Sequence, residues 1–485
     1  MSVLTHLKPT VMWTLFEELC KHPRPSKKED KAVQWVLDLA KQHGWEVLRD
    51  DAGNVVLKKG ATPGMEDRKT VVLQGHIDMV CEKNEGVEHD FDNDPIQPYV
   101  DGNLVKAKGT TLGADNGIGV VAGLAVLTDP AVVHGPIEIL ITMDEETGLT
   151  GASNLSDKLL DGKILLNLDS EEDGAVYIGC SGGKNTRASF AFTPVAPAAG
   201  SAALSISVTG LMGGHSGLNI HEGRANAIKL LVRLLWDLDM KFGISLASIK
   251  GGSAHNAIPR ESFATIAVDT NKLAGVKEYI ASFNTIVKDE NSVLEKNLTI
   301  ACADAALPAT VIENAVKINI LHALYALPHG VYKMSLDIPG LVETSTNLAT
   351  ITTEDGKVSI ITSQRSSVAS EILDIANKVK AVLLLAGAEV VQGDGYPGWK
   401  PNPASEVLGL FKDTFKSLYG KEPEVKAIHA GLECGILGER YPGMDMISFG
   451  PTLHGVHSPD ERIEIDTVEK FWDILVTMLK NVPKK

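Results

Sequence analysis

The sequence predicts an α/β protein with two parts: a discontinuous domain with a mostly parallel sheet flanked by helices, and a large inserted α/β domain. Strand-like apolar segments such as 137–142 and 164–168 alternate with segments of helical periodicity. Continuously apolar strands between helices are typical of a sheet covered on both faces. The chain has 485 residues, and at roughly 150 residues per domain we expect two or three domains.

The expected elements of the first part follow from apolar spacing and turn chemistry. Helical segments repeat apolar residues at intervals of three and four, and an Asp-Gly pair between short apolar runs is typical of a hairpin. In order, the elements are helices at 9–21 and 29–43, strands at 54–57 and 71–73, a hairpin turning at Asp101-Gly102, a helix at 116–127, and strands at 137–142 and 164–168.

A Pro/Ala/Gly-rich connection at 194–203 opens the inserted domain. We expect a strand at 204–208, a helix at 222–239, strands at 244–249 and 263–268, a helix at 274–288 and a strand at 298–301. Residues 311–392 loosely repeat that order of elements, which indicates an internal duplication of pattern. The glycine-rich break at 393–398 then returns the chain to the first domain. The predicted domains are therefore 1–183 with 396–485, and 184–395.

Composition excludes several classes of function. A net charge of −16, spread along the chain, disfavours nucleic acid and anionic membranes as partners. No apolar run reaches the roughly 20 residues of a membrane span, and the N-terminus lacks the pattern of a signal peptide. Five cysteines without a C-x-x-C pair fit a reducing compartment. We expect a cytoplasmic enzyme.

Acidic side chains and one histidine follow several of the predicted strands. His76 and Asp78 follow one strand, and Asp115 lies between glycines just before a helix. Asp144, Glu145 and Glu146 follow a second strand, and Asp169 follows a third. Parallel strands bring such residues to one edge of the sheet, where their mutual repulsion is costly without cations. The pattern therefore favours a metal centre.

Each of these motifs also has a simpler interpretation. H-x-D at a strand end is common on solvated loops, and Asp115 alone is an ordinary helix N-cap. Three consecutive acids on a loop are usually a solvated cluster. A nucleotide-phosphate loop is disfavoured, because the glycine spacing is not G-x-G-x-x-G and a buried anion would repel phosphate.

Taken together, five segments resemble the M20 metallopeptidase family, and most closely its aminoacyl-histidine (Xaa-His) dipeptidase branch. The resemblance covers essentially the whole chain. The segments are GHIDMV at 75–80, GTTLGADNGIG at 109–119, DEETG at 144–148, NLDSEE at 167–172 and GVHSPDER at 455–462.

The resemblance implies two divalent metal ions per subunit, with Zn²⁺ expected and Co²⁺ or Mn²⁺ as substitutes. It assigns the first metal to His76, Asp115 and Asp169, and the second to Asp115, Glu146 and His457, so that Asp115 bridges the two. Glu145 matches the general base that takes a proton from the attacking water. Asp78 matches the acid that orients a histidine ligand.

The inserted domain matches the family's lid. His215 matches a histidine that stabilises the developing oxyanion, and Asn256 and Gly431 match substrate-binding positions. Arg365 matches a clamp for the substrate carboxylate, a role that suits a bidentate guanidinium. Without the resemblance, His215 is better interpreted as a turn residue and Arg365 as a surface charge at a helix start.

The implied function is a cytosolic dipeptidase for Xaa-His and other unblocked dipeptides, β-alanyl-histidine included. An N-acyl-amino-acid deacylase (aminoacylase) of the same family is the alternative, and a metal-stabilised binding protein without turnover is a second. The lid, of about 210 residues, is longer than the family's usual single lid. Its second half could imitate a partner's lid, which leaves open whether His215 acts in its own subunit. We expect a homodimer.

Overall fold

The computed structural model describes residues 2–354 and 356–485, and the chain divides into two compact units. The unit expected to be catalytic, called the catalytic unit below, comprises residues 1–179, 399–427 and 432–485. The unit expected to be the lid, called the lid unit below, comprises 180–398 and 428–431. We expected residues 428–431 in the first domain. They group with the lid unit because the Ser181 amide donates to the carbonyls of Ile428 and Ala430, and Ser345 Oγ is hydrogen-bonded to His429 Nε2.

An eight-stranded mixed sheet forms the centre of the catalytic unit. Its order is β1 (Glu46–Arg49), β2 (Val55–Lys59), β6 (Ile137–Thr142), β3 (Val71–His76), β7 (Ile164–Asn167), β23 (Asp445–Ser448), β8 (Ala175–Cys180) and β22 (Glu424–Ile428). The four central strands, β6, β3, β7 and β23, are parallel, whereas β1, β2 and β8 pair antiparallel to their neighbours. Strands β3, β6 and β7 are buried along their whole length, as expected for a sheet covered on both faces.

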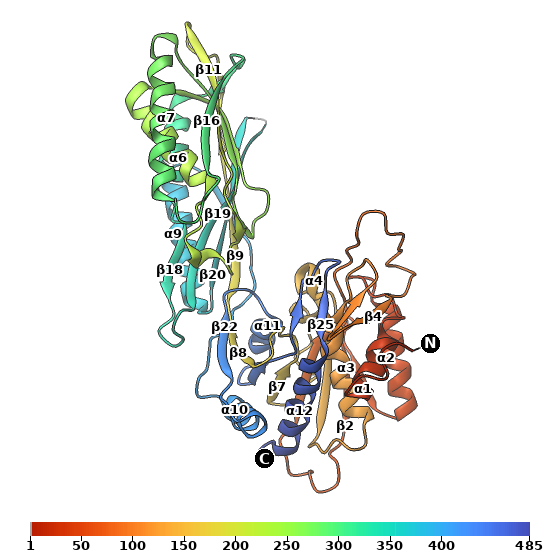
Figure 1. The fold of residues 1–485 in the computed structure, drawn as a ribbon. Coiled ribbons are helices and arrows are strands. Elements are labelled where there is room, and N and C mark those ends of the chain that lie inside the picture. The colour runs from red at the N-terminus through yellow and green to blue at the C-terminus, as the bar shows by residue number, and fades with distance from the viewer. Residues whose placement is uncertain (1, 355) are drawn as a thin grey trace. The chain divides into compact units, whose positions relative to one another are not determined.

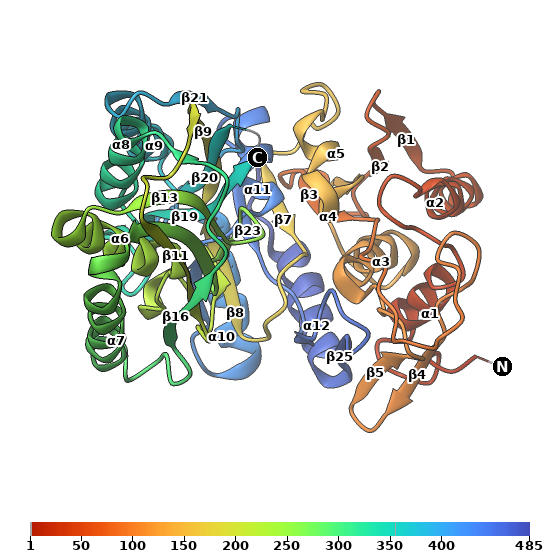
Figure 2. The same cartoon turned by 90° about the horizontal axis from the view of Figure 1, so that it is seen from above.

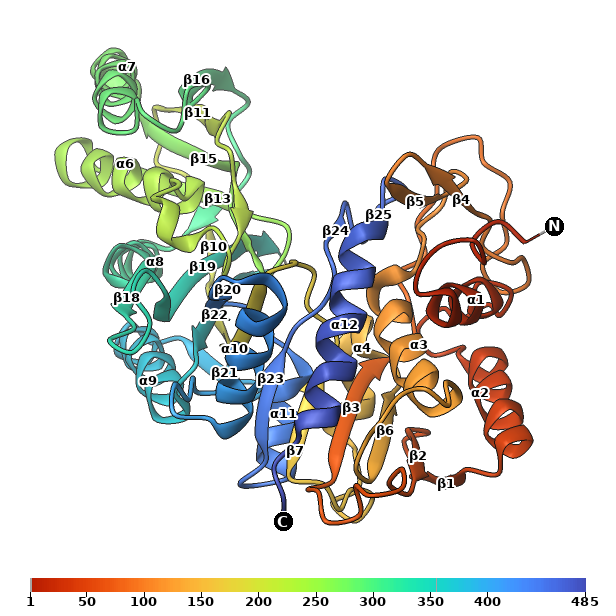
Figure 3. The same ribbon diagram turned by 60° about the horizontal axis from the view of Figure 1, so that its bottom comes forward.

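Helices surround these central strands (Figure 3). They are α1 (Thr10–Leu19), α2 (Asp30–His43), α3 (Ala114–Thr128), α4 (Glu145–Gly148), α5 (Thr150–Ser153), α10 (Glu406–Tyr419), α11 (Glu433–Arg440) and α12 (Ile465–Asn481). Helix α3 packs on α1 and β3, and α10 packs on α12 and β23. The predicted hairpin is β4 (Pro98–Asp101) with β5 (Leu104–Ala107), extended by β25 (Arg462–Glu464) and β24 (Leu453–His454).

The lid unit is built on a nine-stranded sheet (Figure 1). Its order is β16 (Thr299–Ala305), β11 (Ser201–Thr209), β15 (Ser262–Asp269), β13 (Ser245–Gly251), β19 (Val342–Glu354), β20 (Lys357–Ser366), β9 (Gly182–Ala191) and β21 (Glu389–Gln392), with β18 (Gly330–Met334) on β19. The four lid helices, which lie on one face of the sheet (Figure 2), are α6 (Ala227–Phe242), α7 (Leu273–Glu290), α8 (Asn314–Ala326) and α9 (Ala369–Leu385).

The nine-stranded sheet of the lid unit is antiparallel in each strand pair of its described residues. Short connections join only some of these pairs, and they suit antiparallel pairing because a parallel pair needs a crossover of a dozen or more residues. One example is the link between β13 and β15, which holds only the two-residue strand β14 (Ala257–Ile258), paired with β12 (Gly214–His215). The remaining pair is β10 (Pro194–Val195) with β17 (Val311–Ile312).

The sheet order confirms the predicted repetition of pattern. Reading outward from the junction of β13 and β19, the strands are β15, β11 and β16 on one side and β20, β9 and β21 on the other. In each half, two adjacent strands of the chain are followed by a helix and an edge strand. Strand β9 precedes the entire first half in sequence, so the first half is nested within the second.

Helix α6 begins later than the predicted residue 222. Residues 220–222 form a separate 3₁₀ turn, which ends at Gly223 in the left-handed region with φ 78°. The Asn226 side chain then accepts hydrogen bonds from the amides of Ile228 and Lys229 and caps the helix. In the described residues, no helix is long and apolar enough to cross a membrane.

Candidate functional site

The predicted metal residues meet at one edge of the catalytic sheet. His76 ends β3, and Asp169 lies two residues beyond the end of β7. Glu145 and Glu146 open α4, just after β6. The carboxyl ends of parallel strands face the same way, so residues far apart in sequence lie within contact distance.

Two groups of possible metal ligands share one carboxylate. His76 Nε2 lies 3.2 Å from Asp115 Oδ1 and 3.5 Å from Asp169 Oδ1. His457 Nε2 lies 3.1 Å from Asp115 Oδ2 and 3.0 Å from Glu146 Oε2. Both triplets hold their donor atoms within 4.8 Å of one another. Each oxygen of Asp115 thus faces a different histidine, which is the arrangement a bridging carboxylate requires.

Asp78 connects one histidine to the segment that carries Glu145 and Glu146. Its Oδ1 lies 3.3 Å from His76 Nδ1 and accepts the Glu145 amide at 3.0 Å. Its Oδ2 accepts the Glu146 amide at 3.2 Å and the Ser26 hydroxyl at 2.7 Å. A proton on His76 Nδ1 is thereby held toward Asp78, which directs Nε2 to the ligand cluster.

The glycines around Asp115 allow close packing of the site loop. A Cβ on Gly75 would lie 2.2 Å from Asn116 Oδ1, and a Cβ on Gly119 would lie 2.5 Å from the same atom. Asn116 Nδ2 donates to the Leu168 carbonyl at 2.7 Å. Gly75 and Gly119 thus make room for Asn116 beside the site, whereas a Cβ on Gly113 or Gly117 would meet the buried Arg24 guanidinium at 2.4 or 2.9 Å.

Three buried glutamates without a predicted role accept hydrogen bonds at the site, two of them from backbone amides and one from side chains. Glu461 accepts four consecutive amides, those of residues 112–115, at 2.7–3.3 Å. Glu29 accepts the Asp144 amide at 3.0 Å. Glu433 accepts from Gln74 Nε2 at 2.6 Å and from the Thr142 hydroxyl at 2.7 Å. Polar residues inside otherwise apolar strands, such as Gln74, are the sequence signal for such a network.

Replacing Glu461 by glutamine should destabilise the catalytic unit. The amide side chain keeps only one acceptor oxygen for the 112–115 amides and turns its own donors toward the others, at a cost of about 2–3 kcal/mol. We expect a lower free energy of unfolding in urea and weaker metal retention. The exposed Glu469, on α12, gives the control Glu469→Gln, expected within about 0.5 kcal/mol of the parent. Equal stability of both variants would contradict this role.

Burial and neighbouring charges shift the pKa values in the cluster. Hydrogen bonds to Asp115 and Glu146 raise the pKa of His457 to about 11. Burial lowers the pKa of His76, but Asp169 and hydrogen bonds to the surrounding carboxylates raise it well above its usual value. Burial raises the pKa of Asp169 to about 7 and that of Glu145 well above its usual value. The metal-free cluster therefore holds protons at neutral pH.

The residues present fit two divalent cations. The donors are imidazole nitrogens and carboxylate oxygens, which suit zinc and related metals. Glu146 Oε1 is buried and has no hydrogen-bond partner among the described residues. A buried oxygen left without a donor is costly, and a cation beside it would remove that cost.

In the lid unit, His215 and Arg365 come together within one chain. Arg365 Nη2 lies 3.4 Å from His215 Nε2, and Arg365 Nη1 donates to the Tyr396 hydroxyl at 3.0 Å. His215 Nδ1 accepts the amides of Gly217 and Leu218. Since Nδ1 is an acceptor, the ring proton lies on Nε2, where it can be donated to an anion.

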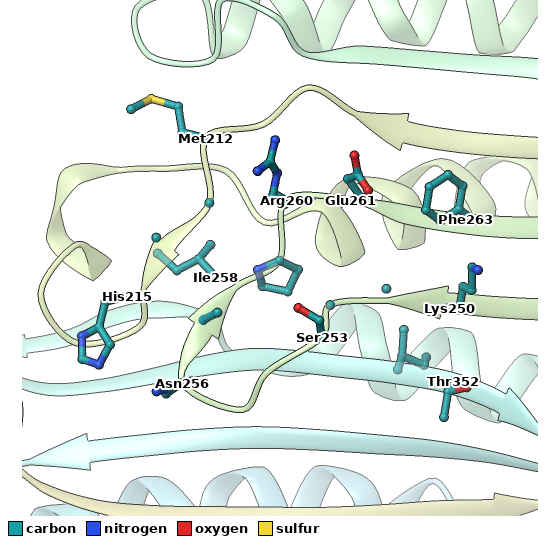
Figure 4. Close-up of a pocket in the computed structure, with 17 residues that line it drawn as sticks. Met212, His215, Lys250, Ser253, Asn256, Ile258, Arg260, Glu261, Phe263 and Thr352 are labelled. Atoms are coloured by element: carbon teal, nitrogen blue, oxygen red, sulfur yellow. The ribbon is translucent and has the colours of Figure 1, made fainter. Parts of the chain in front are cut away.

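Asn256 and Gly431 lie beside this pair within the same unit. Strand β12 pairs with β14, and His215 is opposite Ala257 in that pairing. Asn256, which precedes Ala257, therefore lies beside β12. A Cβ on Gly431 would lie 2.9 Å from the Tyr396 ring. Figure 4 shows His215 and Asn256 at one end of a hollow of about 720 Å³ that also reaches Lys250 and Phe263. Tyr396 is the member of this cluster that the sequence analysis missed.

The chain matches known proteins over its full length. Residues 72–481 match the family model described as peptidase family M20/M25/M40. The cytosol non-specific dipeptidase of Escherichia coli (strain K12) is 43% identical over 485 residues, covering 100% of both chains. The crystal structure of aminoacylhistidine dipeptidase from Vibrio alginolyticus has 45% identity and a TM-score of 0.94, covering 100% of this chain and 99% of that one.

A more distant structure, aminopeptidase PepT from Bacillus cereus, shares the fold alone. Its TM-score is 0.57 at 17% identity, with 98% of this chain and 99% of that chain covered. The family match at 72–481 includes all the segments that carry the candidate ligands, and the similarity to the first two relatives extends over the full length. The chain therefore belongs to the peptidase family M20/M25/M40 and is a hydrolase.

Proposed function

We propose that this protein is a metal-dependent dipeptidase that hydrolyses Xaa-His and other unblocked dipeptides, β-alanyl-histidine included. The observation that carries the proposal is the cluster of two ligand triplets sharing Asp115. Glu145 adjoins the cluster without belonging to either triplet, and it forms a further group with His76 and Glu146.

The proposed cofactors are two divalent ions, Zn²⁺ in preference, with Co²⁺ or Mn²⁺ as substitutes. His76, Asp115 and Asp169 would hold one ion, and Asp115, Glu146 and His457 the other. When bound, such ions lower the pKa of a water molecule and polarise a carbonyl group. Glu145 would then accept the proton of the attacking water and pass it to the leaving amine. Asp78 positions Glu145 through its amide and orients His76.

Metal binding should release protons and weaken as the pH falls. His76 and His457 hold protons at neutral pH in the metal-free protein, because their pKa values are raised, and a metal ion binds only the neutral imidazole. Calorimetric titration of the chelator-treated protein with Zn²⁺, in two buffers of different ionisation enthalpy, measures the protons released. His457→Ala should release fewer. Zinc affinity independent of pH between about 6 and 8 would contradict this expectation.

We propose that the lid cluster contacts the dipeptide. Arg365 suits the C-terminal carboxylate as a bidentate clamp, and the His215 Nε2 proton suits the oxyanion. Asn256 and Gly431 would complete the binding surface. One chain brings His215 and Arg365 together, and the alternative that the pair serves a partner's metal centre stays open. The expected homodimer stays a prediction, which light scattering of the purified protein would test.

The similar proteins support this proposal. The Escherichia coli relative is named a dipeptidase of the cytosol, and the Vibrio alginolyticus structure an aminoacylhistidine dipeptidase. Both match essentially the full length of this chain. On the same grounds we propose a cytoplasmic location.

The experiment that tests the function combines metal analysis with a substrate panel. Alanyl-histidine, β-alanyl-histidine and other dipeptides are compared with N-acetylated amino acids, before and after removal of the metals. We expect dipeptide hydrolysis that is lost on chelation and restored by Zn²⁺. If the protein releases acetate from the N-acetylated amino acids and hydrolyses no dipeptide, it is an aminoacylase and the dipeptidase proposal is wrong.

A further inference from the structure

The loop that carries His215, called the His215 loop below, joins β11 to α6 and comprises residues 210–226. Five of these residues are glycines, and β12 and the 3₁₀ turn at 220–222 are its regular elements. Glycine gives a backbone many accessible conformations, so fixing such a loop in one of them costs conformational entropy. His215 therefore keeps one position only where contacts from outside hold the loop.

A buried carboxylate, that of Glu295, holds both ends of this loop. Glu295 lies in the turn that follows α7 and is only 3% exposed. Its Oε2 accepts the Met212 amide at 2.8 Å, and its Oε1 accepts the Ala225 amide at 2.9 Å. Figure 4 shows Met212 on the segment that leads through β12 to His215, and Ala225 precedes the residue that caps α6. One side chain thus binds the loop on both sides of His215.

The charge of Glu295 strengthens this attachment. Burying a carboxylate is costly unless donors face its oxygens, and the two amides supply one donor to each oxygen. Hydrogen bonds to an ionised acceptor are about twice as strong as those between neutral groups. Glu461 holds the amides of residues 112–115 in the catalytic unit in the same way. Each unit therefore contains a buried glutamate that holds the backbone of a proposed functional loop.

The other contacts of the loop do not replace this attachment. Strand β12 pairs with β14, but each has two residues, and short two-stranded pairs are marginal by themselves. Inside the loop, Asn219 Oδ1 accepts the His215 amide at 2.9 Å, and Arg224 Nη1 donates to the Gly213 carbonyl at 2.6 Å. These two bonds shape the loop from within, whereas Glu295 ties both of its ends to the segment after α7.

The backbone of the loop in turn sets the orientation of the His215 ring. Nδ1 accepts the amides of Gly217 and Leu218 at 3.3 and 3.0 Å, which leaves Nε2 to face Arg365 at 3.4 Å. A shift of the backbone at 217–218 moves the ring with it. In enzymes, a misplacement of about 1 Å at a reacting group costs about 10²-fold in rate.

We propose that Glu295 is a positioning residue for the lid histidine: by holding the Met212 and Ala225 amides, it keeps His215 Nε2 where the oxyanion develops. The inference rests on the proposed function, in which His215 donates to that oxyanion. Glu295 acts through the loop backbone and not on the substrate. Its removal therefore lowers the rate only as long as His215 is present.

The first test is Glu295→Gln, which keeps the size of the side chain but leaves one acceptor oxygen for two amides. We expect kcat for alanyl-histidine to fall about 10-fold, with KM within about twofold of the parent, because the oxyanion contact exists only in the transition state. The metal content should stay unchanged, since the candidate ligands belong to the catalytic unit. Steady-state kinetics and elemental analysis measure these effects.

The decisive test repeats the change in a protein that lacks the histidine ring. In His215→Ala, adding Glu295→Gln should lower kcat by less than about twofold more, because there is no ring left to position. A purely structural role would lower kcat by the same factor in both backgrounds. Glu295→Asp, which keeps the charge but is one methylene shorter, should give an intermediate loss, and it takes the place of Glu295→Gln in the cycle if that variant does not fold.

The matched control is Glu278→Gln, which removes an exposed carboxylate from α7 in the same unit and should leave kcat unchanged. Equal losses from Glu295→Gln in both backgrounds, or no loss in the parent, would overturn the positioning role while the dipeptidase stands. If His215→Ala itself keeps the parent kcat, the lid assignment fails and the positioning role with it. A parent enzyme that hydrolyses no dipeptide would refute the proposed function as a whole.

Discussion

Replacing Glu145 by glutamine should lower kcat by about 10²–10⁴-fold, the usual contribution of a general base. Both metals should remain bound, because Glu145 belongs to neither of the triplets that share Asp115. The amide cannot accept the proton of the attacking water, whereas its size preserves the packing at the start of α4. Steady-state kinetics with metal analysis of the same sample measure both effects.

The matched control for this variant is Glu85→Gln. Glu85 is exposed in the same unit, so the change removes one carboxylate without touching the site. Near-normal turnover of Glu145→Gln with a full metal complement would show that another group takes the proton.

Replacing Asp115 by asparagine should remove both metals and abolish turnover. Each of its oxygens faces a different histidine, so both triplets lose a charged ligand at once. An amide oxygen is a much weaker ligand for zinc than a carboxylate. We expect the metal content to fall from about two ions per chain to less than one, measured by elemental analysis after dialysis.

Asp169→Asn provides the comparison, because Asp169 belongs to one triplet only. It should lose one ion and keep the other. If Asp115→Asn instead loses a single ion, or if the two variants bind metal equally, Asp115 does not bridge the two sites.

The central strands of the catalytic unit and the meeting of the candidate ligands at their edge were predictable because the sequence signals are local. His76, Glu146 and Asp169 stand just after apolar strands, and parallel strands carry such residues to a common edge. His457 was different. It follows no buried parallel strand, and its assignment came from the resemblance of the GVHSPDER segment alone.

The supporting residues could not be predicted, because their contacts are distant in sequence. Glu461 binds amides nearly 350 positions away, and Glu433 reaches two different strands. Strand β9 was missed because its sequence, GGKNTRASFA, is rich in glycine and polar residues. The extended conformation of β9 is stabilised by its pairing with β20 and β21, not by a strong strand preference of its own residues.

The nesting of the lid halves has a consequence for biosynthesis. The strands of the inner half, β11 to β16, lie within residues 201–305, so this half can pair its strands as soon as that stretch leaves the ribosome. Strand β9 is made earlier, yet its partners β20 and β21 end only at residue 392. Such distant pairing slows folding. The first lid strand to be synthesised is therefore among the last to be paired, and it stays exposed to chaperones and proteases for longest.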